Sequence, residues 1–210
     1  MSKTEPFDTH SARYEEWFLE NQFVYESELR AVERFIPSIG EGVEIGIGSG
    51  KFAGPLGIQT GVEPSAAMRE LAEQRGLKVY TAVAEDLPFD DERFDYALMV
   101  TTICFVDDID ASFHEIFRIL RPGGCVILGF VDRNSLLGRI YEEHKNENVF
   151  YRIATFFSTE EVIDLLDRHD FKKPEIIQTV FGTLPDISEV QEAREGYGEG
   201  GFIVIKAVKG

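Results

Sequence analysis

The sequence predicts an α/β fold built on a doubly wound, mostly parallel sheet, and three observations indicate it. An apolar, strand-like segment runs into a glycine-rich turn at residues 43–50, where the sequence reads VEIGIGSG. Short apolar runs then alternate with segments of helical periodicity as far as residue 131, which is typical of parallel strands covered by helices on both faces. Near the C-terminus two strand-like runs lack a helical pattern of adequate length between them, so a last antiparallel strand is expected.

The elements are expected in the following order. Apolar residues at steps of three and four predict a helix, or a pair of helices, over residues 10–36, ending before Pro37. A helix over 65–75 has Ser65 as its cap and Gly76 at its exit, and a helix from Ser158 to about residue 169 opens with a capping box. The other expected elements are a short helix at 50–56, a helix at 109–120, and strands at 43–47, 58–63, 77–81, 94–100, 124–131, 174–180 and 202–208.

Length and charge restrict the partners. The 210 residues predict one domain, with 1–40 as a helical cover, 41–131 as the cofactor-binding half, 132–157 as a lid insertion and 158–210 as a C-terminal helix and strand hairpin. The chain has 38 acidic and 21 basic residues, a formal charge of -17, which repels phosphate backbones and anionic lipid. We therefore expect no nucleic acid and no membrane as partners. Without a secretory signal or an apolar run of roughly 20 residues, a cytoplasmic location is expected.

The two cysteines predict neither a disulfide nor a metal site. Cys104 and Cys125 each lie within an apolar run, and neither has a neighbour at metal-ligand spacing. Cys104 also lacks the adjacent histidine pattern that would activate a nucleophilic thiol. We expect two buried thiols in a reducing compartment.

The glycine-rich turn and a later carboxylate together predict a nucleoside-containing ligand. Glycines at 46, 48 and 50 let the backbone turn sharply and approach a ligand closely. Glu63 follows the next short apolar run, where a carboxylate can accept hydrogen bonds from ribose hydroxyls. Nicotinamide and flavin folds follow Gly-x-Gly-x-x-Gly, and Lys51 stands where the third glycine would be needed. The spacing therefore argues against a dinucleotide.

Several motifs occur in a family-like order. The turn reads Glu-x-Gly-x-Gly-x-Gly from Glu44, and it is followed by AEDLPF at 84–89, FDYALMV at 94–100 and LRPGG at 120–124. From residue 43 to about residue 131 the chain resembles class I S-adenosylmethionine-dependent methyltransferases, and most of all the small-molecule branch that includes ubiquinone and menaquinone biosynthesis enzymes. The resemblance implies a Rossmann-like, seven-stranded sheet whose last two strands form a long hairpin, with S-adenosylmethionine as cofactor and a small-molecule methyl acceptor.

The resemblance also implies which residues hold the cofactor. Backbone near Gly46, Gly48 and the start of a helix at Gly50 would hold the methionine part, Glu63 the ribose, and the Thr101 backbone the amino group. Glu44 either accepts from the cofactor through water or only organises the turn. The complete expected set is Glu44, Gly46, Gly48, Gly50, Glu63, Pro64, Ala84, Glu85 and Thr101.

Two departures from the family pattern affect this assignment. Only 13 residues separate Gly50 from Glu63, about one helical turn fewer than usual, so the first helix must be stunted. Val83 stands where many relatives carry an aspartate for the adenine amino group. Adenine would then depend on backbone near Ala84 and Glu85. The acids Glu85 and Asp86 are equally consistent with plain surface residues.

Methyl transfer from a sulfonium has an excellent leaving group, so a strong general base is optional. If one is used, Tyr14, Asp132, His144 and Tyr197 are the candidates, because they lie in segments expected over the site. Two alternatives stay open. One is a non-catalytic nucleoside-binding module of the same fold, and the other is a nicotinamide-dependent oxidoreductase. The acceptor and the oligomeric state are not determined by these patterns.

Overall fold

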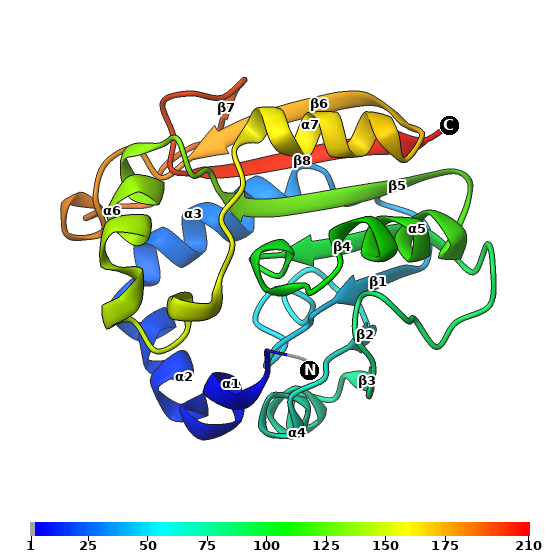
Figure 1. Ribbon diagram of the computed structural model, residues 1–210, viewed down its shortest axis with the longest axis horizontal. Helices are drawn as coiled ribbons and strands as arrows, with labels where there is room; N and C mark the ends of the chain where they lie inside the picture. The colour runs from blue at the N-terminus through cyan, green and yellow to red at the C-terminus, as the bar shows by residue number, and fades with distance from the viewer. Residues whose placement is uncertain (1–2) are drawn as a thin grey trace.

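The centre of the molecule is an eight-stranded sheet, shown by a computed structural model that describes residues 3–210 (Figure 1). Its strand order is β3-β2-β1-β4-β5-β8-β6-β7. The strands are β1 (Gly42–Ile45), β2 (Thr60–Val62), β3 (Lys78–Tyr80), β4 (Phe94–Val100), β5 (Leu120–Val131), β6 (Phe171–Thr179), β7 (Arg194–Glu195) and β8 (Phe202–Lys209).

The strand directions confirm the predicted fold class. Strands β1 to β5 pair in parallel, and β8 inserts antiparallel between β5 and β6. The two-residue β7 at the edge adds an eighth strand to the seven expected. Because β1 lies beside β4 in the sheet, the chain leaves β1 toward one edge and returns at β4 toward the other. This reversal of strand order creates a crevice at the carboxyl ends of β1 and β4, where α/β proteins bind ligands.

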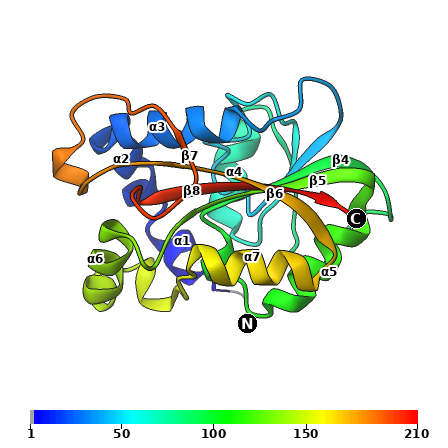
Figure 2. The ribbon, with the colours of Figure 1, turned by 90° about the horizontal axis from the view of Figure 1, so that it is seen from above.

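Helices cover both faces of the sheet (Figure 2). On one face lie α5 (Ile109–Ile119) and α7 (Thr159–Arg168), which bury Phe113, Ile116 and Leu165 against the strands. On the other lie α3 (Gln22–Glu33) and α4 (Ala66–Gln74), and α3 buries Val24 and Val32. Each such side chain contributes about 1.5–3 kcal/mol when fully buried. The two apolar layers hold the sheet rigidly beneath the crevice.

Of the helix or pair of helices expected over residues 10–36, the structure shows the pair, α2 (Ser11–Glu20) and α3, and a further short helix, α1 (Glu5–Thr9), precedes it. Asn21 separates α2 from α3, and its side-chain Nδ2 donates to the Trp17 carbonyl at 3.0 Å. Figure 1 shows α2 and α6 (Leu136–His144) at the end of the sheet where β5 finishes. Residues 1 and 2 of the expected cover lie outside the described part of the chain.

The prediction of a short helix at 50–56 is wrong. The chain makes successive turns from residue 49 to 57 instead, and the Ile58 N–H returns to the Ala53 carbonyl at 2.9 Å. Three glycines at 50, 54 and 57 together with Pro55 make helix formation expensive here. Residues 49–57 therefore form a glycine-rich turn, and no helix begins at Gly50.

The two irregular connections contain some regular structure. Residues 132–157 include α6, which begins where the Ser135 hydroxyl accepts from the Gly138 N–H at 2.9 Å. Residues 181–201 include a single 3-10 turn and β7. Strand β6 begins at Phe171, three residues before the expected start, and its pairing with β8 is irregular between Lys172 and Glu175, where Pro174 has no N–H to donate. In the described residues, no helix has the length and apolarity to span a membrane.

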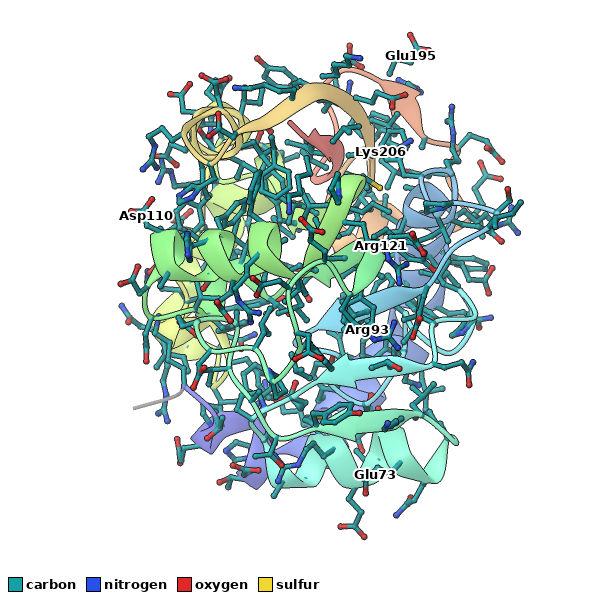
Figure 3. The ribbon with its side chains drawn as sticks, turned by 90° about the vertical axis from the view of Figure 1, so that its right-hand side faces the viewer. Glu73, Arg93, Asp110, Arg121, Glu195 and Lys206 are labelled. Atoms are coloured by element: carbon teal, nitrogen blue, oxygen red, sulfur yellow. The ribbon has the colours of Figure 1, made fainter. Side chains whose placement is uncertain are left out.

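Exposed ion pairs lie at the opposite end of the sheet, where the parallel strands begin. Figure 3 faces this end and labels Arg93 and Arg121. Arg93 pairs with Glu41 at 2.5 Å, and Arg121 pairs with Asp95 at 2.7 Å. Exposed pairs of this kind contribute little to stability, about 0–1 kcal/mol each.

Candidate active site

A cavity of about 690 Å³ opens at the carboxyl ends of β1 and β4. It lies where the strand order reverses, so its floor comes from loops that follow neighbouring parallel strands. The structure brings seven of the nine expected cofactor residues to its wall: Gly46, Gly48, Glu63, Pro64, Ala84, Glu85 and Thr101. Glu44 and Gly50 do not line it, and Gly50 packs against Leu77 instead.

The glycines of the turn are required by the protein itself. Gly46 and Gly48 have φ of +69° and +55°, which side chains rarely adopt. A Cβ on Gly48 would lie 3.0 Å from the Tyr14 hydroxyl, and one on Gly46 would overlap the Thr102 side chain. Because Gly46 and Gly48 have no side chains, Tyr14 and Thr102 can pack closely against them. For the same reason, a ligand in the cavity can approach the backbone at these two positions.

Glu44 lies beneath this turn, fully buried. Burial raises the pKa of its carboxyl well above the usual value, and the charge of Glu63 adds to the rise, whereas a hydrogen bond from the Ala53 N–H opposes it. Among residues 3–210 its Oε2 has no hydrogen-bond partner. The bond to Ala53 ties β1 to the turn that replaces the expected helix.

Glu63 connects three parts of the site. Its Oε2 accepts from the Gly48 N–H at 3.0 Å and its Oε1 accepts from the Ser65 N–H at 2.8 Å. Burial raises the pKa of Glu63 to about 7. The two backbone hydrogen bonds and the charge of Arg69 lower this pKa, but burial has the larger effect. An ionised carboxylate has about four acceptor positions, so two remain for hydroxyl donors in the cavity.

Farther from the glycine turn, the cavity wall is mostly backbone and apolar surface. Val83 and Ala84 line it, and no aspartate takes the place of Val83. The Glu85 carboxylate accepts from the Asp107 N–H at 2.6 Å and the Asp108 N–H at 3.1 Å, so it joins two loops at the cavity edge. Thr101 has a φ of +49°, a strained backbone that costs about 1–3 kcal/mol. Such strain is common where a backbone is held for function.

Helix α2 is fastened over the glycine turn by Glu15. Its carboxylate pairs with Lys51 at 3.1 Å and with Arg75 at 2.6 Å, and Arg75 also donates to the Ser49 carbonyl. The contacts place Tyr14 against Gly48. Burial raises the pKa of the Tyr14 phenol, as does the charge of Glu63, so Tyr14 stays a neutral hydroxyl.

We expect Glu15→Ala to raise the dissociation constant for a ligand of the cavity by about 3- to 10-fold, because two partly exposed ion pairs are worth roughly 1 kcal/mol together. Calorimetric titration measures the change. The loss should shrink in 0.5 M salt, which already screens these pairs in the parent protein. An effect that is equally large at high salt would contradict this explanation.

The four suggested general bases lie in different surroundings. Tyr14 lines the cavity, whereas Asp132, His144 and Tyr197 do not. Asp132 is buried and accepts from the Thr159 hydroxyl at 2.6 Å and the Asn134 N–H at 2.7 Å. His144 is exposed beside Glu147, and Tyr197 is 42% exposed.

The segments expected as a cover form the second half of the cavity wall, but none of its residues was predicted from sequence as a site residue. This half is formed by Glu28 of α3, Trp17 and Phe18 of α2, Tyr141 of α6, and Phe150 and Tyr151. A signal for Glu28 was present, because it stands at a four-residue step from Val24 and from Val32, on the apolar stripe of its helix. A carboxylate on an apolar helix stripe indicates that this part of the helix faces something other than the hydrophobic core, and here it faces the cavity.

Comparison with known proteins identifies the family. Residues 43–128 match the model of a methyltransferase domain. The fold superimposes with a TM-score of 0.95 on a SAM-dependent methyltransferase of Thermotoga maritima, described as a possible histamine N-methyltransferase. The two share 50% sequence identity, over 98% of this chain and 99% of that one. The chain belongs to the S-adenosylmethionine-dependent methyltransferases.

The chain is also similar to two curated proteins. An uncharacterized protein of Methanocaldococcus jannaschii is 45% identical to this chain over 203 residues, which is 97% of this chain and 98% of that protein. A demethylmenaquinone methyltransferase of Roseiflexus castenholzii is 38% identical over 101 residues, or 43% of this chain and 42% of that protein. The resemblance stated from the motifs is confirmed, and so is S-adenosylmethionine as the cofactor.

Proposed function

We propose that the enzyme transfers the methyl group of S-adenosylmethionine to a small molecule bound in the same cavity. The supporting observation is the cavity itself, because one continuous space joins the cofactor wall at Gly48 and Glu63 to the second wall at Glu28 and Tyr141. Its volume of about 690 Å³ falls within the range of roughly 300–1,000 Å³ that small-molecule pockets occupy.

The cofactor wall fits S-adenosylmethionine. Gly46 and Gly48 form a cradle that a Cβ at either position would disturb, and the Glu63 carboxylate stands ready to accept ribose hydroxyls. Adenine would lie against Val83 and Ala84. When bound, the cofactor supplies a sulfonium methyl group with an excellent leaving group.

The protein contributes orientation and exclusion of water. Phe7, Phe105 and Phe150 form an aromatic cover over the cavity, and the Phe7 ring centroid is 5.1 Å from Phe105 and 5.2 Å from Phe150. Closely packed rings from α1 and two distant loops keep water from the reacting atoms. Holding donor and acceptor in line can supply most of the acceleration for a displacement of this kind.

Product formation tests this proposal. The protein is incubated with S-adenosylmethionine carrying a labelled methyl group and a panel of small molecules, and S-adenosylhomocysteine is quantified. The panel includes histamine, because the Thermotoga maritima relative is described as a possible histamine N-methyltransferase. We expect acceptor-dependent release of S-adenosylhomocysteine and label in the acceptor. Tight cofactor binding without turnover on any acceptor would favour a non-catalytic binding module.

A further inference from the structure

Glu28 is a buried carboxyl group in the second wall of the cavity. Its side chain comes from the inner face of α3 and is only 5% exposed. Within the described chain, residues 3–210, no side chain or backbone group forms a hydrogen bond or an ion pair with its carboxylate. The group is a component of the cavity wall, so a bound molecule can reach it.

A carboxylate in a mostly buried position is costly without a protein partner, because it loses much of its hydration and gains no hydrogen bond from the protein in return. Burial alone raises the pKa of Glu28 to about 8. Its neighbours on the same stripe, Val24 and Val32, are apolar and fully buried, so the fold has no need of a charge at this place. The missing partner is therefore best supplied by a ligand.

The surroundings of Glu28 are aromatic. The rings of Tyr141 and Tyr151 stack with centroids 4.7 Å apart, and the charge of Glu28 contributes to raising the pKa of both phenols, after burial. Trp17 and Phe18 line the same space from α2. Aromatic faces attract cations within about 6 Å of the ring centre. A carboxylate beside such rings is the arrangement that suits an ammonium group.

The charged residues that line the cavity also favour a cationic ligand. Glu16, Glu20, Glu63, Glu85 and Asp107 also line it, whereas its basic lining residues are Lys3 and Arg13. The Lys3 ammonium is engaged by the Val106 carbonyl at 3.1 Å and lies 3.8 Å from Asp107. A surplus of carboxylates raises the local concentration of cations and repels anions.

We propose that Glu28 binds a protonated amine carried by the methyl acceptor, between α3 and the tyrosine pair. The proposal rests on the proposed function, because it assigns the acceptor end of the same cavity. Binding would form a charge-assisted hydrogen bond from the ammonium group to the carboxylate, which neutral and anionic molecules of the same shape cannot form.

The proposal has a signature in proton release. At pH 7 the carboxyl group of the free protein is mostly protonated, since its pKa is about 8. An arriving ammonium favours the carboxylate, so close to one proton leaves for the buffer with each amine bound. The phenols of Tyr141 and Tyr151, the groups coupled to Glu28, have raised pKa values and stay neutral at this pH.

The experiment is calorimetry on the full chain saturated with S-adenosylhomocysteine. The probes are primary arylalkylamines with chains of increasing length, each paired with the alcohol of the same skeleton. Titrations at pH 7 in buffers of different ionisation enthalpy give the number of protons released. We expect amines to bind better than their alcohols, and Glu28→Gln to weaken amine binding by about 10- to 100-fold and to abolish the proton release.

Glu33→Gln provides the matched control, because Glu33 lies on the same helix but is exposed and does not line the cavity. It should bind amines as the parent protein does. Amine binding that Glu28→Gln leaves unchanged, alcohols that bind as well as amines, or no binding of either series would overturn the proposal. These outcomes leave the proposed function intact as long as S-adenosylhomocysteine binds and turnover occurs, whereas loss of both would mean that the proposed function itself fails.

Discussion

Glu63→Ala should raise the dissociation constant for S-adenosylmethionine by about 100-fold or more. The carboxylate accepts from the backbone of Gly48 and Ser65, and its free positions face the cavity where the ribose would lie. A hydrogen bond to a charged group is worth about 1.5–3 kcal/mol, so losing two ribose bonds costs roughly 3–6 kcal/mol of binding free energy. Calorimetric titration with S-adenosylmethionine and S-adenosylhomocysteine measures the change.

Two controls separate lost binding from lost structure. Glu73→Ala changes an exposed carboxylate on the nearby α4, labelled in Figure 3, and should bind as the parent does. Glu63→Gln keeps an oxygen acceptor for one backbone N–H, so it should fold normally yet bind weakly. A folded Glu63→Ala variant with the affinity of the parent protein would disprove the ribose assignment.

Glu28→Gln should change how the stability of the ligand-free protein depends on pH. The folded pKa of about 8 lies above the ordinary value of 4.5, so the folded state favours the protonated form. This contribution is fully present below pH 4.5 and is lost as pH rises through 8. The parent protein should therefore lose on the order of 5 kcal/mol of unfolding free energy over that interval from this group, and the glutamine variant should not.

Chemical denaturation of both proteins at a series of pH values gives the comparison. Glu44 and Glu63 also have raised pKa values, so they too make the folded state less stable as pH rises. The informative quantity is therefore the difference in unfolding free energy between the parent and the Glu28→Gln variant. Glu33→Gln should follow the parent at every pH. If the curves of the parent and Glu28→Gln run parallel from pH 5 to pH 9, Glu28 does not carry the raised pKa.

The cavity wall at Gly46, Gly48 and Glu63 was predictable from sequence because local geometry sets the positions of these residues. Gly46 and Gly48 must adopt positive φ directly after a strand, and Glu63 follows the next parallel strand, so strand alternation alone places them at one edge. The expected helix at 50–56 failed for an equally local reason. The family pattern suggested a helix there, but glycines at 50, 54 and 57 favour turns.

The second wall of the cavity could not be assembled from sequence, because it comes from segments far apart in the chain. Glu28, Tyr141 and Tyr151 meet only after α3 packs on the sheet and α6 folds over its end. Asp132, His144 and Tyr197 show the reverse case. They lie in the connections expected over the site, yet their side chains bond elsewhere or face solvent, since a segment's position does not determine the direction of each side chain.

A crystal structure with S-adenosylhomocysteine tests the central claim most directly, because it shows which wall holds the cofactor. The account predicts one molecule in the cavity, with its ribose hydroxyls on the Glu63 carboxylate, its homocysteine along Gly46 and Gly48, and its sulfur facing the space beside Glu28 and Tyr141. A ligand bound elsewhere, or one whose ribose makes no contact with Glu63, would contradict it.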